Sequence, residues 1–419
     1  MFAKVKGTQD FLDLALMQGV LAKVHRFLAI NNFSEIATPL LEHASLFERG
    51  LGNETDVVSK QMFFIASDKE EKDRLCLRPE ATAGIMRAFL EHQHELTLPW
   101  KVYTVGPMFR YERPQKGRYR QLHQINLEAI GIASLEYDAL FIAMLQHLFE
   151  EILGLSTFVL KINYLGDVQD RERYKKALRE FLQNNAEDIC ATCLHRKDTN
   201  VLRVLDCKVE GCQKIYEKAP IITAYFSEET MQEWQALQKN LQLLGVTFSH
   251  DPFLVRGLDY YNRTVFEFVG TALGAQNALC GGGRYDGLAQ ELGSKELIPS
   301  IGVGIGLERL LLLCQEHADQ LALQKPALHM IIPFEQEQHT LGLLIALNLT
   351  KHGLCTDILL ESSSIKSKMK KANKLGAAYV VLIGQDELAN NYVTVKHMIK
   401  GTEEKVEQGK LLAYLRAHQ

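Results

Sequence analysis

The character of the sequence changes near Gln324-Lys325-Pro326, and this change constrains the fold more than any other feature. Beyond it, strand-like and helix-like segments alternate over residues 329–333, 340–351, 355–360, 365–375, 379–383, 392–395 and 409–418. Strands that alternate with helices are typical of a small α/β domain with a largely parallel sheet. We therefore predict two domains, 1–325 and 326–419, which suits a chain of 419 residues.

In the first part of the chain, two strand-like runs flank a very polar loop. Residues 101–105 and 121–130 predict an antiparallel hairpin. Arg110 stands at the start of the connecting loop, which also carries Glu112, Arg113, Lys116, Arg118 and Arg120. Arginine suits phosphate, because its planar fork donates two parallel hydrogen bonds and keeps its charge. The loop is therefore a candidate phosphate site, although most charged loops are only solvated surface.

Polar residues also gather on the second run and before a predicted helix. Gln124 and Glu128 are four residues apart, so they share one face of a strand. An amide and a carboxylate on one face could hold an ammonium group or an imidazole, whereas the alternative for Glu128 is an exposed strand position. Glu80 and Thr82 flank a predicted helix start, where their alternative role is capping.

Three further segments combine glycine with arginine or tyrosine. They are Val255-Arg256-Gly257-Leu258-Asp259-Tyr260-Tyr261, Gly281-Gly282-Gly283-Arg284-Tyr285-Asp286 and Gly302-Val303-Gly304-Ile305-Gly306-Leu307-Glu308-Arg309. The glycine triplet lacks the lysine ending of a P-loop, so we expect it to let the backbone approach a flat ligand closely. The last segment lacks the βαβ unit of a dinucleotide-binding loop, and we expect it to lead from a strand into a helix.

Residues 168–250 are rich in Lys, Glu, Gln and Leu at helical spacing and predict a mostly helical insertion. This segment contains four cysteines in a C-x2-C-x13-C-x4-C pattern, Cys190, Cys193, Cys207 and Cys212. Four thiolates in two short-range pairs could hold a structural zinc ion tetrahedrally. The alternative is a set of free thiols inside a helical insertion.

Together these segments resemble the class II aminoacyl-tRNA synthetases, and within that class the histidyl-tRNA synthetases. Residues 106–131 and 302–310 are similar to the second and third motifs of the class. Residues 254–261 and 281–286 are similar to two signatures of the histidine enzymes. Ala81 departs from the family, which more often has glycine at that position.

The resemblance covers nearly the whole chain and implies its architecture. We expect an α+β catalytic domain with an antiparallel sheet over 1–325, interrupted by the helical insertion at about 168–250. Residues 326–419 are expected to form an α/β anticodon-binding domain. A homodimer is implied by the family as well.

The resemblance also implies a reaction and the residues that perform it. Members of the family activate L-histidine with ATP and Mg²⁺ to histidyl-adenylate, transfer the histidyl group to the 3′ end of tRNA(His), and release AMP and diphosphate. By resemblance, Arg110 and Arg256 hold the α-phosphate from opposite sides, Arg309 holds the γ-phosphate, and Glu112 joins the ATP-binding set. The residues implied for histidine are Glu80 and Thr82 (amino group), Gln124 (carboxylate), Glu128 and Tyr261 (imidazole), and Arg256, Tyr260 and Tyr285 (remaining pocket).

Charge and hydropathy constrain the partners and the location. The formal net charge is −4, so an RNA-binding surface must gather its positive charge locally. One segment gathers positive charge and contains no acidic residue; its lysines are Lys366, Lys368, Lys370, Lys371 and Lys374. These lysines could contact RNA phosphates, or they could simply form a solvated helix face. The sequence has no long apolar run and its N-terminus lacks the apolar core of a signal peptide, so we expect a cytoplasmic protein without a membrane span.

Three other functions account for only part of this sequence. A non-catalytic synthetase paralogue that regulates histidine biosynthesis would typically lack the anticodon domain and lose the histidine signatures, and this chain retains both. A different class II synthetase would not carry the segments around Tyr261 and Tyr285. A plain RNA-binding protein would not need Arg110, Arg256 and Arg309 in these settings.

Overall fold

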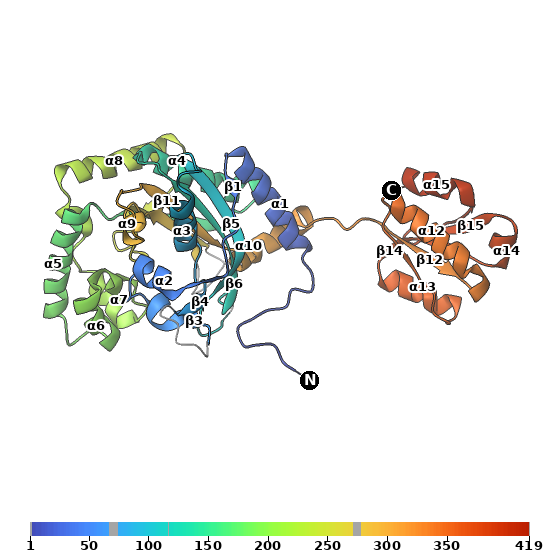
Figure 1. The fold of residues 1–419 in the computed structure, drawn as a ribbon, viewed down its shortest axis with the longest axis horizontal. Coiled ribbons are helices and arrows are strands. Elements are labelled where there is room, and N and C mark those ends of the chain that lie inside the picture. The colour runs from blue at the N-terminus through green and yellow to red at the C-terminus, as the bar shows by residue number, and fades with distance from the viewer. Residues whose placement is uncertain (1, 67–73, 116, 271–277, 419) are drawn as a thin grey trace. The chain divides into compact units, whose positions relative to one another are not determined.

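The computed structural model describes residues 2–418 apart from 67–73, 116 and 271–277. The chain divides into two compact units, Met1–Leu323 and Gln324–Gln419, each with a sheet of its own. Figure 1 shows the helices of each unit packed around that sheet. None of the described helices is both long enough and apolar enough to cross a membrane.

The main sheet of the first unit has the strand order β1-β5-β6-β11-β10-β9-β7-β8. Its strands are β1 Ser34–Glu35, β5 Trp100–Phe109, β6 Gln121–Ile130, β7 Phe158–Tyr164, β8 Ser249–His250, β9 Asn262–Gly270, β10 Ala278–Arg284 and β11 Ser300–Gly306. Central neighbours pair antiparallel, and the short edge strands β1 and β8 pair parallel. The predicted hairpin is confirmed, because β5 and β6 pair antiparallel over their whole length.

Helices cover both faces of this sheet. One face shares a core with α1 Ala15–Ile30, α4 Leu135–His147, α8 Glu228–Leu243 and α10 Leu307–Cys314. The other face shares a core with α2 Ala44–Leu51, α3 Thr82–His92 and α9 Leu288–Glu291. Helix α1 illustrates the local cause, since Val20, Val24, Phe27 and Leu28 recur at helical spacing and are buried.

Shorter elements complete the first unit. Strands β2 Leu41–His43, β3 Phe63–Phe64 and β4 Leu75–Leu77 form a small antiparallel sheet. The short helical turns are η1 Val57–Gln61, η2 Leu148–Ile152, η6 Gln315–His317 and α11 Ala318–Leu321.

The alternation of side chains along β6 and β11 decides where a site can form. Ile125 and Leu127 of β6 pack in the core with α1 and α4, as do Ile301, Val303 and Ile305 of β11. Because the strand period is two, the residues between them face the other side of the sheet. Those residues are Gln124, Asn126 and Glu128 on β6 and Gly302, Gly304 and Gly306 on β11. The central strands therefore present a floor of polar side chains and glycines.

The predicted helical insertion is present between β7 and β9. Its elements are α5 Val168–Asn184, α6 Ala191–Thr199, η3 Val201–Asp206, α7 Glu210–Tyr216, η4 Ile222–Tyr225 and α8. Helix α5 begins with a capping box, in which Asp167 accepts from the Asp170 N–H at 2.7 Å and Asp170 accepts from the Asp167 N–H at 3.2 Å. A separate core includes Tyr174, Leu178 and three of the four cysteines. Figure 1 shows α5, α6 and α7 grouped beside the main sheet.

The second unit has a five-stranded mixed sheet in its described residues, with the order β13-β12-β14-β15-β16. Its elements are β12 Leu328–Pro333, η7 Gln336–Gln338, α12 His339–Lys351, β13 Thr356–Ile358, α13 Ile365–Lys374, β14 Ala377–Ile383, α14 Gln385–Ala389, β15 Tyr392–His397, β16 Glu403–Glu407, η8 Gln408–Lys410 and α15 Leu411–Ala417.

The expectation of a largely parallel sheet in this unit was wrong. Strands β12, β13 and β14 pair parallel, but β15 and β16 add antiparallel pairings. Strand β16 is a charged edge strand in which only Val406 is buried, so it has no apolar alternation to find in the sequence. It follows β15 after a short turn, which is too short for a parallel crossover.

The lysine-rich segment forms helix α13, but its lysines are not equivalent. Lys368 is buried and donates a hydrogen bond to the Pro333 carbonyl at 2.7 Å. It lies four residues before buried Ala372, so helical spacing turns both toward the sheet. Including Lys368 in a basic surface was therefore wrong, while Lys366, Lys370, Lys371 and Lys374 remain exposed.

Candidate active site

A cavity of about 810 Å³ opens over the polar floor of the main sheet. Its walls come from the α3 start, the β5–β6 loop, β9, β10, β11 and the insertion. Most of the residues predicted for substrates line this cavity, namely Glu80, Thr82, Arg110, Glu112, Gln124, Arg256, Tyr260, Tyr261 and Arg309. Glu128 and Tyr285 lie one layer deeper, fully enclosed by protein.

Backbone carbonyls fix two of the three arginines. Arg110 donates its Nε–H to the Pro79 carbonyl at 2.8 Å. Arg309 donates to the carbonyls of Gly117 at 3.0 Å and Ala278 at 2.6 Å. Neither side chain has an acidic hydrogen-bond partner among the described residues. Both guanidinium groups line the cavity, and no described carboxylate forms a hydrogen bond with either of them.

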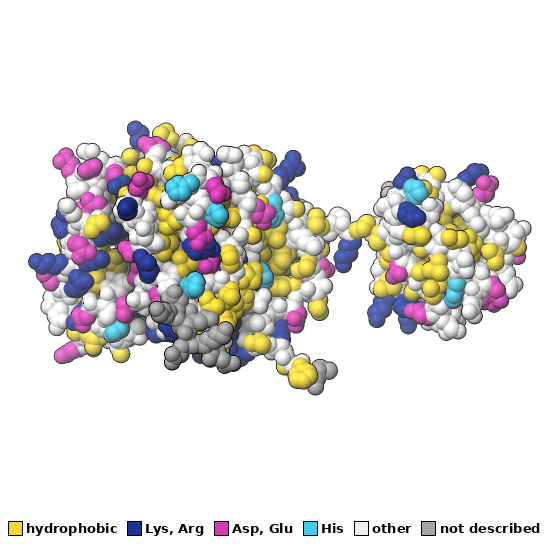
Figure 2. Space-filling view, in the orientation of Figure 1, with side chains coloured by type: hydrophobic (Ala, Val, Ile, Leu, Met, Phe, Trp, Pro, Cys, Tyr) yellow, Lys and Arg dark blue, Asp and Glu magenta, His cyan; other side chains and the backbone are white. Residues whose placement is uncertain are grey.

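The arginines also repel one another. Burial, followed by the charges of Arg118 and Arg110, lowers the pKa of Arg309. Burial likewise lowers the pKa of Arg110, with Glu80 opposing the shift. On the drawn face of the first unit, by contrast, basic and acidic side chains are interspersed (Figure 2). Cations that are brought together inside a cavity favour a polyanionic ligand, since such a ligand relieves their repulsion.

Arg256 enters the cavity from the segment before β9. Its guanidinium donates to Glu267 Oε1 at 2.9 Å, and although burial opposes it, the Glu267 charge raises the pKa of Arg256. The guanidinium lies flat against Gly281, where any Cβ atom would collide with it. Glu267 was not predicted from the sequence. It lies between Phe266 and Phe268, which are buried in the core, so its side chain is on the opposite, polar face of β9.

The glycine triplet of β10 lies where neighbouring groups approach its backbone closely. A Cβ at Gly281 would collide with the Arg256 guanidinium, one at Gly282 with the Gly302 carbonyl, and one at Gly283 with the Thr264 carbonyl. Gly281 also lines the cavity, so the expectation that the triplet lets a ligand approach the backbone stays a prediction.

Glu80 combines both roles considered for it. Its carboxylate accepts hydrogen bonds from the N–H groups of Thr82 at 2.7 Å and Ala83 at 2.8 Å, so it caps the first turn of α3. It also lines the cavity and interacts with the charge of Arg110. Burial raises the pKa of Glu80, and the two N–H groups and Arg110 oppose the shift.

Glu128 is held by two hydroxyl groups beneath the cavity. It accepts a hydrogen bond from Thr82 Oγ1 at 2.7 Å and another from the Tyr285 hydroxyl. Burial raises its pKa to about 8, against the opposing effect of these hydrogen bonds. Gly302 on the adjacent strand leaves room for the carboxylate, because a Cβ there would lie 2.6 Å from its carboxyl carbon. The alternative of an exposed strand position for Glu128 was wrong.

Three polar atoms at this site are buried and have no hydrogen-bond partner in the described parts of the chain. They are Gln124 Oε1, Asn126 Oδ1 and Arg256 Nε. Two acceptors and one donor left open at a cavity surface are available to a ligand. Sequence reasoning missed Asn126, although the period of two that pairs Gln124 with Glu128 also includes it.

Two tyrosines close one side of the cavity. The rings of Tyr260 and Tyr261 are 4.6 Å apart between centroids, and those of Tyr260 and Tyr285 are 5.6 Å apart. Arg284, within the same signature as Tyr285, serves the fold instead. It is 1% exposed, pairs with Asp138 and donates to the Ile132 carbonyl at 2.7 Å.

The four cysteines converge in the insertion. The Sγ atoms of Cys190, Cys193, Cys207 and Cys212 all lie within 4.8 Å of one another, and three of these residues are buried. Cys190 and Cys207 also line the same cavity as the arginines and tyrosines described above.

Comparisons with known proteins agree over the full length. A family model described as histidyl-tRNA synthetase matches residues 12–310, and one described as anticodon binding domain matches 329–418. The chain is 40% identical to the histidine--tRNA ligase of Aquifex aeolicus, over 97% of this chain and 99% of that protein. It is 41% identical to that of Koribacter versatilis, over 100% and 97%. The crystal structure of apo S. aureus histidyl-tRNA synthetase matches with a TM-score of 0.81 and 31% identity, covering 99% of each chain.

Proposed function

Because the chain belongs to the histidyl-tRNA synthetase family, we propose that it is a histidine–tRNA ligase whose cavity arginines perform the adenylation. It activates L-histidine with ATP, transfers the histidyl group to the 3′ end of tRNA(His), and releases AMP and diphosphate. The full-length relatives favour this activity over a regulatory paralogue. The assignment of residues rests on the cavity, because Arg110, Arg256 and Arg309 line the same space as Glu80 and Tyr261.

In the proposed first step, the histidine carboxylate attacks the α-phosphorus of ATP, and the bond to the bridging oxygen breaks as pyrophosphate leaves. Negative charge grows on the α-phosphate oxygens, so fixed cations stabilise the transition state. Arg110 and Arg256 are assigned to this phosphate, and Arg309 is assigned to the γ-phosphate. Their anchoring to Pro79, Glu267 and the carbonyls of Gly117 and Ala278 means that little reorganisation is needed when ATP binds.

ATP enters as its Mg²⁺ complex, as the family implies. When bound, Mg²⁺ would offset the negative charge that develops on the leaving pyrophosphate. Oxygen ligands suit this ion, and Glu267 and Glu308 line the cavity close enough to influence the pKa of Arg309. These carboxylates fit a Mg²⁺ ion held mainly by ATP and water. Glu112 is assigned to the ATP side and pairs with Arg118.

Histidine recognition is assigned to the polar floor and the tyrosine wall. Glu80 and Thr82 would receive the amino group, and Gln124 would lie beside the carboxylate. Glu128 and Tyr261 would read the imidazole, and Tyr260 and Tyr285 would complete the pocket. Thr82 and Tyr285 each donate to one oxygen of Glu128 in this structure, so each oxygen keeps a further acceptor site for the ligand. A pocket that pairs both imidazole nitrogens rejects apolar analogues, since its own groups would be left unpaired.

The second unit is assigned to anticodon binding, in agreement with its family model. Lys366, Lys370 and Lys374 on α13 are the proposed phosphate contacts, whereas Lys371 pairs with Glu361. We also propose a homodimer, a cytoplasmic location and a structural zinc ion at the four cysteines.

Histidine-dependent pyrophosphate exchange tests the roles of the arginines. Arg110→Ala and Arg309→Ala should lower the exchange rate at least about 100-fold, as expected for removing a charge-stabilising donor. Arg173→Ala is the matched control, because Arg173 pairs with Asp170 on the insertion, away from the cavity. If both cavity variants exchange as fast as this control, the assigned roles are wrong.

A further inference from the structure

The cysteine cluster has nearly the geometry of a tetrahedral metal site. A zinc ion with Zn–S bonds of about 2.3 Å holds its sulfur atoms about 3.8 Å apart. Cys190 Sγ and Cys207 Sγ are 3.9 Å apart, and no pair of the four exceeds 4.8 Å. A contraction of less than about 1 Å would therefore close the site at the bond lengths that zinc prefers.

The surroundings of the sulfur atoms supply hydrogen bonds that suit thiolates. The Cys190 N–H donates to Cys212 Sγ at 3.2 Å, and the Val209 N–H donates to Cys207 Sγ at 3.4 Å. The Tyr216 hydroxyl is buried beside Cys193, and among the described residues no nitrogen or oxygen atom bonds it. Amide and hydroxyl donors around metal-bound sulfur orient the ligands and stabilise their charge.

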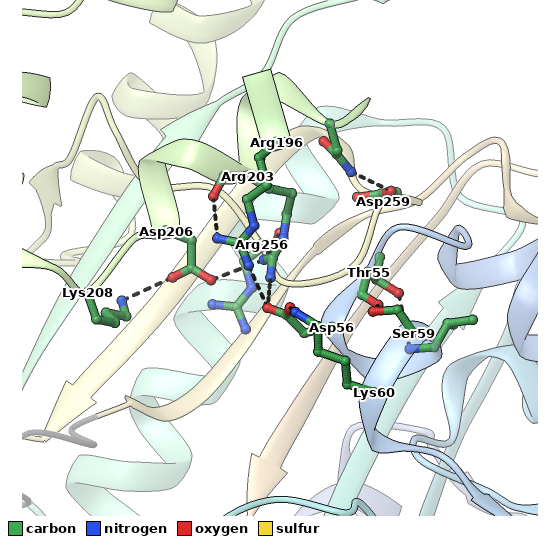
Figure 3. A network of polar contacts seen from close by, with 12 residues as sticks. Thr55, Asp56, Ser59, Lys60, Arg196, Arg203, Asp206, Lys208, Arg256 and Asp259 are labelled. Atoms are coloured by element: carbon green, nitrogen blue, oxygen red, sulfur yellow. Dashed lines mark hydrogen bonds and ion pairs between the residues drawn. The ribbon is translucent and has the colours of Figure 1, made fainter. Parts of the chain in front are cut away.

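The segment between the two cysteine pairs contacts the active site. It runs from Cys193 to Cys207 and contains most of α6 and the whole of η3. Figure 3 shows that Arg196 and Arg203 of this segment converge on Asp56. Arg196 reaches Asp56 Oδ2 at 2.7 Å, and Arg203 reaches the same oxygen at 3.2 Å.

Arg203 extends this contact to the backbone of a proposed catalytic residue. It is 5% exposed and donates to the Arg256 carbonyl at 3.2 Å and to Asp206 Oδ2 at 3.1 Å. Asn200 of the same segment donates to Asp259 Oδ2 at 2.7 Å, three residues beyond Arg256. The segment between the cysteine pairs thus contacts residues 256–259 at two points, the Arg256 carbonyl and the Asp259 side chain.

We propose that a Zn²⁺ ion bound by Cys190, Cys193, Cys207 and Cys212 fixes the segment between them, and that Arg203 of this segment positions Arg256 for catalysis. Zinc binding would close the segment into a loop with fixed ends, so its side chains meet Asp56 and the Arg256 carbonyl in one arrangement. Arg203 touches no substrate and is a positioning residue. The kinetic part of this inference rests on the proposed function, whereas the metal site does not.

Metal content of the purified full-length chain tests the site. Elemental analysis should find close to one zinc per chain in the wild type and in Cys355→Ser, a control outside the cluster. Cys193→Ser and Cys207→Ser should each lose most of it. Because these variants could misfold, Co²⁺ exchange into the wild type provides a second measurement, with the charge-transfer absorption of a four-thiolate site expected. A wild type that binds neither metal overturns the proposal.

The positioning role is tested by Arg203→Met, with Arg203→Lys as the conservative variant and Arg173→Met as the control. Arg203→Met should keep its zinc but lower kcat for histidine-dependent exchange at least about tenfold, because small displacements of a catalytic group have large effects. KM for histidine should change much less, and Arg203→Lys should recover part of kcat. An Arg203→Met rate equal to that of the control, or no recovery with lysine, overturns the positioning role. Loss of exchange in the wild type would instead refute the proposed function, and the zinc measurement would still stand.

Discussion

The Gly302→Ala substitution probes the buried Glu128 site from the neighbouring strand. A Cβ at Gly302 would lie 2.6 Å from the carboxyl carbon of Glu128 and 2.9 Å from the Leu127 carbonyl oxygen. The backbone of β11 is fixed by pairing on both sides, so the carboxyl group must move. Its displacement breaks the hydrogen bonds from Thr82 and Tyr285.

The magnitude follows from these contacts. Two hydrogen bonds at about 1–1.5 kcal/mol each, with overpacking of about 1–3 kcal/mol, give a loss of about 3–6 kcal/mol in the free energy of unfolding. At about 2 °C per kcal/mol for a large unit, Tm should fall by about 6 °C or more. KM for histidine should also rise, because the displaced carboxyl group no longer faces the imidazole.

Calorimetry and histidine-dependent exchange measure the two effects. Gly304→Ala is the matched stability control, since it adds the same methyl group two residues along the same face. There the nearest atom is the Asn126 side-chain nitrogen at 3.2 Å, which can rotate away. If the Tm values of the two variants agree within about 2 °C and Gly302→Ala leaves KM for histidine unchanged, the account of Glu128 is refuted.

Three more predictions address the site and the RNA contact. The pKa of Glu128 is raised from 4.5 to about 8, so between these pH values the folded state binds a proton that the unfolded state has lost. The free energy of unfolding therefore falls as pH rises through this range. Glu128→Gln should flatten the pH dependence of Tm, and an unchanged profile would count against this titration. Arg256→Ala should lower the rate of adenylate formation about 100-fold, while KM for histidine changes less than about threefold. Single-turnover kinetics separate the rate from histidine binding. An unchanged rate would contradict the role of Arg256. Replacing Lys366, Lys370 and Lys374 by alanine should raise KM for tRNA about tenfold without affecting pyrophosphate exchange, and the effect should shrink at high salt; equal KM values would exclude α13 from the RNA contact.

Local pattern was sufficient to predict much of the fold. Helical spacing identified the helical insertion between β7 and β9, and the two β runs around Arg110 identified the β5–β6 hairpin, because both patterns reside in contiguous residues. Strand β16 was missed, since a solvated edge strand such as Glu403–Glu407 needs no apolar alternation. Lys368 was misplaced because composition counts lysines without assigning them to a helix face.

The site was predictable in its residue types and less so in its layers. The resemblance indicated Glu128 and Tyr285 as site residues. Their position beneath Thr82 depends on the packing of three separate segments, which the sequence does not report. The contact of Arg203 with Asp56 joins residues 147 positions apart, and no local pattern reports it. Such long-range pairs arise from tertiary packing, which is why the positioning role of the insertion emerged only from the structure.

The proposed function requires that this cavity activate histidine and no other amino acid. Pyrophosphate exchange by the wild type, measured with each amino acid in turn, is the decisive experiment. We expect exchange with histidine, and less than about 1% of that rate with any other amino acid, because a pocket with paired polar groups discriminates strongly. Comparable exchange with a second amino acid, or none with histidine, would refute the proposed function.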